Sequence, residues 1–340
     1  MSPRHFGYQD KILLLQHGCS DLLALAQRRG ALLHKLLSGT GIFEQDLHKP
    51  LGRLHYSDWL TLLKNCQQQL NSPELPYLLG NALLNSRYIS LCQSLHYAQN
   101  LPQALSQLYY FRHQLFPCFY ARLYRQQNCI VIEFKPALGL ANQHGFMLTL
   151  LCSLILGLIK QQLASVSGIS LQLQHAESAQ QQQFFGVDVS FNQAADCLSI
   201  PLSLWRQPFV DGDAVQFSAK TRSCRQLNRV INKQRTLPEL ICRLQRRALP
   251  QLLSQEQVAA MLGLSSSSLK RQLSQHRTHF AALIDGVRRD AARQLLQQGH
   301  YSNRQLASRL GYYDEHNFRR AFKRWTGVIP SSFKGLFNTH

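Results

Sequence analysis

The spacing of apolar residues along the chain predicts helices at both ends and strands in the middle. Between residues 13 and 37 leucines recur three and four positions apart, and similar spacing continues to about residue 115, which is typical of amphipathic helices. In 119–134 the period becomes two: Ile130, Ile132 and Phe134 alternate after a polar tip at 125–128. This pattern predicts a β-hairpin.

The middle of the chain combines one strongly apolar stretch with further alternating segments. The run FMLTLLCSLILGLI at 146–159 is shorter than the ~20 residues that span a bilayer, so it predicts a buried helix over 144–163 and no membrane partner. Alternating apolar positions at 169–173, 187–191 and 197–202 predict three more strands. The front part of the chain is therefore expected to be an α+β domain with four or five strands.

A change in composition marks the domain boundary. Between Pro208 and Pro238 the chain becomes polar and increasingly basic, and after Pro238 the pattern is helical throughout. We expect an α+β domain at 1–215, a linker at 216–237 and an all-helical domain at 238–340.

The helical domain contains an internal repeat. VAAMLG at 258–263 corresponds to LASRLG at 306–311, 48 residues later, whereas LKRQL at 269–273 corresponds to FRRAF at 318–322, 49 residues later. The second copy thus has one extra residue in its turn. Each copy has a helix that ends at a glycine, a short turn, and a basic second helix after a small polar cap, which predicts two helix-turn-helix units.

A long helix is expected to join the two units, from His279 to Gln298, with apolar residues along one face and Gly299 at its end. Twenty residues of helix span about 30 Å. This is close to the ~34 Å between successive major grooves on one side of B-DNA, so one chain could insert both second helices along the same duplex face.

The charge of the chain is concentrated in this helical part. The net charge is +19, of which residues 1–219 carry +3 and residues 220–340 carry +16. The excess favours a polyanionic partner for the C-terminal third and a different partner for the rest.

The sequence contains no motif for disulfide formation, metal binding, nucleotide binding or catalysis. The nine cysteines are scattered, without a C-x-x-C pair or a signal peptide, which indicates reduced thiols in a cytoplasmic protein. No metal-binding spacing of histidines or cysteines, no nucleotide-binding loop and no catalytic motif is found. We therefore expect no metal, no cofactor and no enzymatic activity.

The segment GYYDEHNFRRAFKRWTGVIPSSFK at 311–334 closely resembles the signature of the AraC/XylS transcriptional regulators, and the resemblance extends over 240–335. Two positions depart from the family pattern: the glycine common before the linker helix is absent from 275–278, and Phe333 replaces a usual tyrosine. Residues 25–208 more loosely resemble the arabinose-binding-type sensor region of the family. The resemblance implies an α+β sensor domain followed by an all-α domain of two helix-turn-helix units joined by a long linker helix.

The resemblance also implies which residues contact DNA. These side chains suit base edges in the major groove or phosphates of the backbone; the alternative is that they form only a solvated helix face. The expected base contacts are Ser267, Ser268, Lys270 and Arg271 on the first recognition helix, and Glu315, His316, Asn317, Arg319 and Arg320 on the second. The expected phosphate contacts are Lys323 and Arg324. Five apolar residues are expected in the core: Leu269, Leu273, Phe318, Phe322 and Trp325.

The sequence therefore predicts a transcriptional regulator that binds operator DNA. A small-molecule effector is expected in the N-terminal domain. The apolar helix at 144–163 against the hairpin suggests either a largely hydrophobic pocket for it or simply core packing. Alternatively, that domain serves only oligomerisation or protein docking, without an effector. A homodimer and RNA polymerase are further possible partners.

Overall fold

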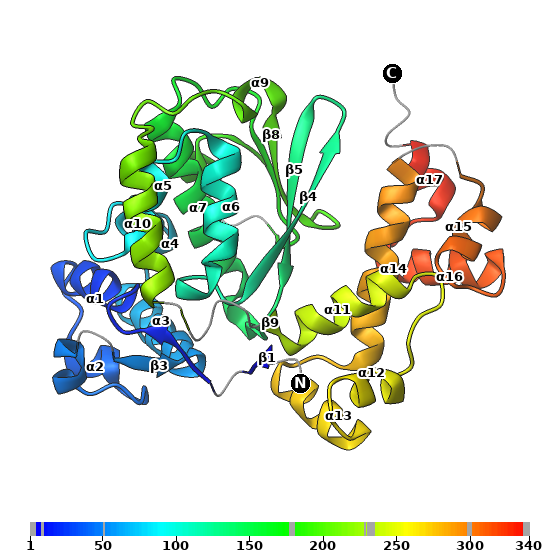
Figure 1. Cartoon of the computed structure of the whole chain (residues 1–340), viewed down its shortest axis with the longest axis horizontal. Helices are drawn as coiled ribbons and strands as arrows, with labels where there is room; N and C mark the ends of the chain where they lie inside the picture. Colours follow the sequence, from blue (N-terminus) through cyan, green and yellow to red (C-terminus); the bar gives the residue numbers. More distant parts are fainter. Residues whose placement is uncertain are drawn as a thin grey trace. The chain divides into compact units, whose positions relative to one another are not determined.

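The computed structural model describes residues 5–7, 10–49, 52–176, 181–227, 229, 235–297 and 301–335. The chain forms two compact units. The N-terminal unit is Tyr8–Lys233, and the C-terminal unit combines Met1–Gly7 with Gln234–His340. Figure 1 shows the elements of each unit along the chain.

The N-terminal unit is α+β, as the sequence predicts. Its helices are α1 (Cys19–Arg28), α2 (Leu33–Leu37), α3 (Tyr56–Leu70), α4 (Leu75–Leu84), α5 (Ser90–His96), α6 (Leu101–Tyr110), α7 (His144–Gln162), α8 (Gln181–Phe185), α9 (Leu202–Trp205) and α10 (Ala214–Leu227), with short 3₁₀ turns at Glu44–His48, Arg112–Gln114 and Ala141–Gln143. Its strands are β2 (Lys11–Leu14), β3 (Arg53–His55), β4 (Phe119–Gln126), β5 (Cys129–Pro136), β6 (Ser170–Gln172), β7 (Asp188–Ser190) and β8 (Asp196–Pro201).

The main sheet has five strands in the order β4-β5-β8-β6-β7. All neighbours are antiparallel except β6 and β7. The expected hairpin is β4–β5, in which Ala121 pairs with Phe134 and Leu123 with Ile132. Because paired residues point to the same face, these four side chains share the sheet face that α6 and α7 cover. A second sheet of β2 and β3 lies in the part expected to be wholly helical.

Helix α7 is the core helix of this unit. By length and composition alone, α7 is long and apolar enough to span a membrane. In the structure, however, most of its residues are buried inside the N-terminal unit, where the helix packs against α4. The expectation of a buried helix at 144–163 is thus correct.

The region expected as a linker at 216–237 overlaps structured elements at both of its ends. Residues up to Leu227 belong to α10, which packs on α5 and buries Cys224, so the N-terminal unit extends past residue 215. A short strand, β9 (Arg235–Thr236), precedes the first helix of the C-terminal unit.

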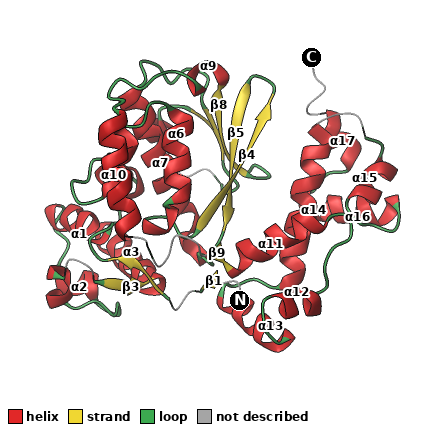
Figure 2. Cartoon of the chain, in the orientation of Figure 1, coloured by secondary structure: helices red, strands yellow, loops and turns green. Residues whose placement is uncertain are grey.

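The C-terminal unit is helical apart from one pair of short strands (Figure 2). Its helices are α11 (Leu237–Ala248), α12 (Gln255–Met261), α13 (Ser266–Gln275), α14 (Phe280–Gln297), α15 (Asn303–Arg309), α16 (Glu315–Thr326) and α17 (Pro330–Gly335). The strand pair joins β1 (His5–Phe6) to β9 in parallel, so the beginning of the chain packs on this unit. Nothing local in the sequence indicates that pairing.

Two hydrophobic clusters correspond to the two repeat copies. The first cluster surrounds Leu269 and Leu273, and the second surrounds Phe318 and Phe322; all four side chains are buried as expected. Trp325 is only partly buried and packs on the edge of the second cluster. Helix α14 has 18 residues, a length of about 27 Å, and Gln298 and Gly299 lie outside the described residues.

Candidate functional site

The two repeat copies are two helix-turn-helix units, α12–α13 and α15–α16. Their turns have the same backbone geometry. Gly263 and Gly311 take left-handed φ angles of 68° and 70°. In the first turn the Leu264 N–H donates to the Ala259 carbonyl, and in the second the Tyr312 N–H donates to the Ala307 carbonyl, both at 2.9 Å.

The similarity of the two units extends to their first residues, where no capping motif was expected. Ser254 and Gln257 form a capping box on α12, and Ser302 and Gln305 form the same box on α15. In both boxes the glutamine Oε1 accepts from the serine N–H at 2.8 Å, and the serine Oγ accepts from the glutamine N–H at 3.2 Å. The pattern Ser-x-x-Gln before an apolar run could have revealed both boxes.

Helix α13, the expected first recognition helix, exposes three of its four expected base contacts. The side chains of Ser267, Lys270 and Arg271 are exposed, whereas Ser268 is half-buried. The N-cap Ser265 hydroxyl lies 3.0 Å from the hydroxyls of both Ser267 and Ser268. The two serines are therefore held at the start of the helix, and the two basic side chains extend beyond them.

The second recognition helix, α16, carries four exposed candidate side chains: His316, Asn317, Arg319 and Arg320. Asp314 caps the helix, accepting from the Asn317 N–H at 2.7 Å and from its Nδ2 at 2.9 Å. Glu315 is half-buried and accepts a 3.2 Å hydrogen bond from Asn303 Nδ2 at the start of α15. Asn317 and Glu315 are thus oriented by neighbouring residues before any DNA binds.

Of the two expected phosphate contacts, Lys323 is exposed and Arg324 makes an ion pair. Arg324 Nη2 lies 2.8 Å from Asp285 Oδ2 on α14, and 66% of the arginine side chain remains exposed. This exposed pair connects α16 to the linker helix, and an exposed ion pair of this kind contributes little to stability.

Another arginine, Arg288 of the linker helix α14, holds the turn of the second helix-turn-helix unit in place. Arg288 donates from Nε to the Leu310 carbonyl at 3.0 Å and from Nη2 to the Gly311 carbonyl at 2.9 Å. Its guanidinium carbon also lies 4.3 Å from the centre of the Tyr312 ring. Helix α14 therefore positions the start of α16 through a planar group with two fixed hydrogen bonds.

Within 275–278, where the glycine common in the family is absent, Arg277 has a strained backbone conformation. Arg277 has φ +54°, the left-handed conformation that favours glycine. The Thr278 N–H donates to the Leu273 carbonyl at 3.1 Å and the Arg277 N–H to the Ser274 carbonyl at 2.9 Å, the two bonds of a Schellman motif at the end of α13.

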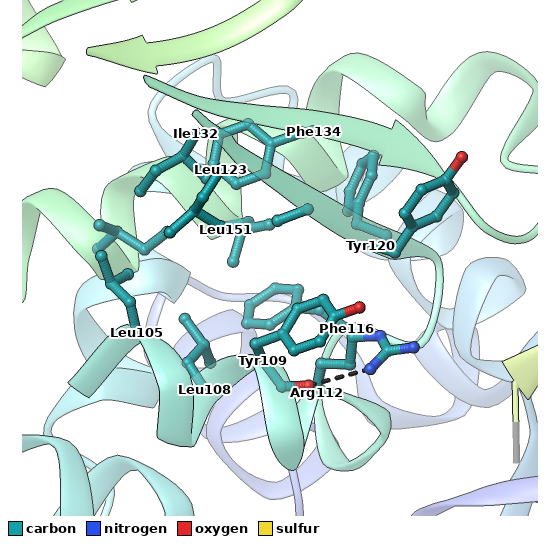
Figure 3. A pocket seen from close by; sticks show the side chains of 13 residues that line it. Leu105, Leu108, Tyr109, Arg112, Phe116, Tyr120, Leu123, Ile132, Phe134 and Leu151 are labelled. Carbon is teal, nitrogen blue, oxygen red and sulfur yellow. Dashed lines mark hydrogen bonds between the residues drawn. The ribbon is translucent and has the colours of Figure 1, made fainter. Parts of the chain in front are cut away.

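The N-terminal unit contains an apolar pocket between the sheet and its helices. The cavity has a volume of about 50 Å³. Figure 3 shows leucine and aromatic side chains from α6 and its following turn facing side chains of the hairpin, with Leu151 of α7 between them. Thirteen residues line it: Leu105, Leu108, Tyr109, Arg112, Phe116, Phe119, Tyr120, Ala121, Leu123, Ile132, Phe134, Leu151 and Ile155. The hydrophobic pocket expected beside α7 is present.

One charged side chain, Arg112, belongs to this lining. It is 8% exposed, its Nη1 donates to the Tyr109 carbonyl at 3.0 Å, and its guanidinium lies over the Tyr109 ring at 4.6 Å. Among the described lining residues none carries a carboxylate. The lining is thus predominantly apolar, with Arg112 as its one charged side chain.

The described cysteines form no metal-binding group, and burial makes several of them unreactive. Among the described residues no group of three His, Cys, Asp or Glu side chains could hold a metal ion. Burial raises the pKa of Cys66 to about 11 and that of Cys118 to about 12, which keeps both in the unreactive thiol form.

Comparisons with known proteins agree with this geometry. Residues 258–335 match the helix-turn-helix domain family, and residues 30–209 match the arabinose-binding domain of AraC transcription regulator, N-terminal. The chain is 27% identical over 319 residues to the ornithine utilization regulator of Pseudomonas aeruginosa, covering 92% of this chain and 94% of that protein. It is 36% identical over 101 residues to the HTH-type transcriptional regulator VirS of Mycobacterium tuberculosis, 29% of each chain.

Among solved structures, the crystal structure of the transcriptional regulator CdpR from Pseudomonas aeruginosa is similar at 19% identity and a TM-score of 0.44, with 93% of this chain and 97% of that chain covered.

Proposed function

Because the chain belongs to the AraC family of DNA-binding transcriptional regulators, we propose that a small molecule bound in the N-terminal pocket controls how the C-terminal unit binds its operator. The observation that carries this proposal is the apolar pocket between α6, α7 and the β4–β5 hairpin, within the part that matches the arabinose-binding domain. The ligand must bind the DNA-binding-competent arrangement with a different affinity from the other arrangement, since only that difference shifts the equilibrium.

On the DNA side, we propose that Lys270 and Arg271 of α13 and Arg319 and Arg320 of α16 contact base edges. Their exposure on the second helix of each unit supports this assignment. Lysine and arginine pair with guanine O6 and N7. The remaining proposed base contacts are Ser267, Ser268, Glu315, His316 and Asn317, and the proposed phosphate contacts are Lys323 and Arg324.

The pocket supports an effector that is mostly apolar. Twelve of its thirteen lining residues are uncharged, and none offers a carboxylate to an ammonium group. A basic amino acid such as ornithine would leave its side-chain charge unpaired there, which is costly in an apolar site. We therefore do not extend the ornithine-related role of the similar Pseudomonas protein to this chain.

The remaining partners are proposed from the family. We propose that the protein acts in the cytoplasm as an activator that contacts RNA polymerase, forms a homodimer, and catalyses no reaction. The alternative for the N-terminal unit is oligomerisation or docking alone. Its supporting observation is the exposure of Tyr110 on α6 and of Leu123 in the pocket lining, at 50% and 51%.

A ligand panel tests the proposed function. The full chain is screened by thermal unfolding against amino acids, sugars and fatty acids, and each hit is tested for its effect on operator affinity. Ala121→Leu, which fills the pocket, should abolish the shift in unfolding temperature, whereas Ala219→Leu on the exposed face of α10 should preserve it. If no compound of any class shifts unfolding or operator affinity, and self-association alone changes DNA binding, the docking alternative is correct.

A further inference from the structure

The single residue by which the second helix-turn-helix exceeds the first is Tyr313. Gly311 and Tyr312 match Gly263 and Leu264 in their backbone bonds, and Asp314 matches Ser265 as the N-cap of the following helix. Only Tyr313, between Tyr312 and Asp314, has no counterpart in the first turn.

Tyr313 contributes nothing to the packing of the turn. Its neighbours are fixed from inside: Arg288 holds the Gly311 carbonyl and covers the Tyr312 ring, and the Asp314 side chain caps α16. Tyr313 itself is 99% exposed. Because a fully solvated ring gains no burial energy on folding, this side chain is available to a molecule outside the chain.

The position of Tyr313 indicates that the molecule outside the chain is DNA. It lies two residues before the first residue of α16, the helix that carries the exposed His316, Asn317, Arg319 and Arg320. When the N-terminal turn of a recognition helix enters the major groove, the residues just before it lie at the groove edge, where the sugar–phosphate backbone runs. Tyrosine hydroxyls are among the groups that hydrogen-bond to phosphate oxygens there.

We propose that Tyr313 contacts the DNA backbone at the edge of the groove that α16 enters, with its hydroxyl donating to a phosphate oxygen and its ring against the adjoining deoxyribose. The contact rests on the DNA-binding function of the C-terminal unit. Because the first turn lacks this residue, the contact exists in only one of the two half-sites. It therefore favours one orientation of the chain on its operator.

The test compares Tyr313→Phe and Tyr313→Ala with the wild-type full chain on an operator selected by the wild type. The Phe variant loses the hydroxyl bond and should bind about threefold to tenfold more weakly, in line with the net worth of one hydrogen bond. The Ala variant also loses the ring and should bind more weakly still. Phosphate ethylation interference should disappear at one position, at the α16 end of the site, in both variants.

Two controls separate this contact from other effects. Tyr88→Ala removes a ring that is 67% exposed on the N-terminal unit and should change neither affinity nor the interference pattern. The dependence of affinity on salt should be unchanged in Tyr313→Phe, because an uncharged hydroxyl releases no counterion. Thermal unfolding should also match the wild type in both Tyr313 variants.

An unchanged affinity and interference pattern in Tyr313→Ala would overturn the proposal. Unchanged DNA binding with reduced transcription would likewise overturn it, and would assign Tyr313 to a protein partner such as RNA polymerase. A wild-type chain that selects no DNA sequence would instead contradict the DNA-binding function itself.

Discussion

His5 and Gln272 are joined by a hydrogen bond of 2.9 Å between Nε2 and Oε1. His5 belongs to the first strand of the chain and Gln272 to the first recognition helix, so residues 267 positions apart meet within the C-terminal unit. The neighbouring Phe6 is 1% exposed, and its strand pairs with β9 just before α11. The beginning of the chain is therefore a structural part of the DNA-binding unit.

Phe6→Ala should destabilise the C-terminal unit by about 3 kcal/mol or more, because a buried phenylalanine is replaced by a cavity. Gln272→Ala should cost about 1 kcal/mol, the net value of one hydrogen bond. Calorimetry of the full chain should show the loss in the transition of this unit. The exposed Gln275→Ala on the same helix serves as control and should leave it unchanged. A Phe6→Ala chain with unaltered unfolding would show that the strand is not part of the unit.

Arg277→Gly should stabilise the C-terminal unit by a few tenths to about 1 kcal/mol. Glycine relieves the left-handed strain at this position, an advantage partly offset by the greater freedom of glycine in the unfolded chain. Arg277→Ala retains the strain and should give no such gain, which separates the backbone effect from loss of the side chain. A stabilisation of equal size in both variants would attribute the effect to the arginine charge instead.

Arg271→Ala and Arg320→Ala should each reduce the affinity for one operator by ~1–3 kcal/mol and relax base preference at one position, as expected for base contacts. Binding selections with each variant would show the affected position, one in each half-site. A uniform loss of affinity across all sequences, with a smaller salt dependence, would indicate phosphate contacts for these two residues.

Acid should weaken the N-terminal unit through His17. Burial lowers the pKa of this histidine to about 4 from 6.5. Below pH 6.5 the unfolded chain binds a proton that the folded chain does not, so stability falls as the pH decreases towards 4, by about 3 kcal/mol in total. His17→Gln should remove this part of the acid sensitivity, measured as unfolding free energy against pH. The exposed His34→Gln should retain it; identical pH profiles for all three chains would contradict the assignment to His17.

The sequence predicted those features that a local pattern of residue types marks along the chain. The β4–β5 hairpin and the buried helix α7 follow from the spacing of apolar residues. The two helix-turn-helix units follow from the internal repeat, and their two glycines have the left-handed geometry that the repeat implies.

The features that the sequence did not predict depend on residues far apart in the chain. Strand β1 has two residues, and its partner β9 lies about 230 positions away. The contact of α7 with the hairpin was expected, but the contribution of α6 to the pocket, through residues such as Leu105, was not, because only the fold brings that helix to the site. The hydrogen bond by which Arg288 holds the second turn also depends on distant residues, because it forms only when α14 packs against α15 and α16.

We propose that one chain reads DNA with both α13 and α16. The most direct test is a methylation-interference footprint of the full-length wild-type chain on its selected operator. We expect guanine contacts in two major-groove segments on one face of the duplex, ~10 base pairs apart. Each segment should be lost separately, one in Arg271→Ala and the other in Arg320→Ala. Contacts in a single groove segment, unaffected by one of these two substitutions, would contradict it.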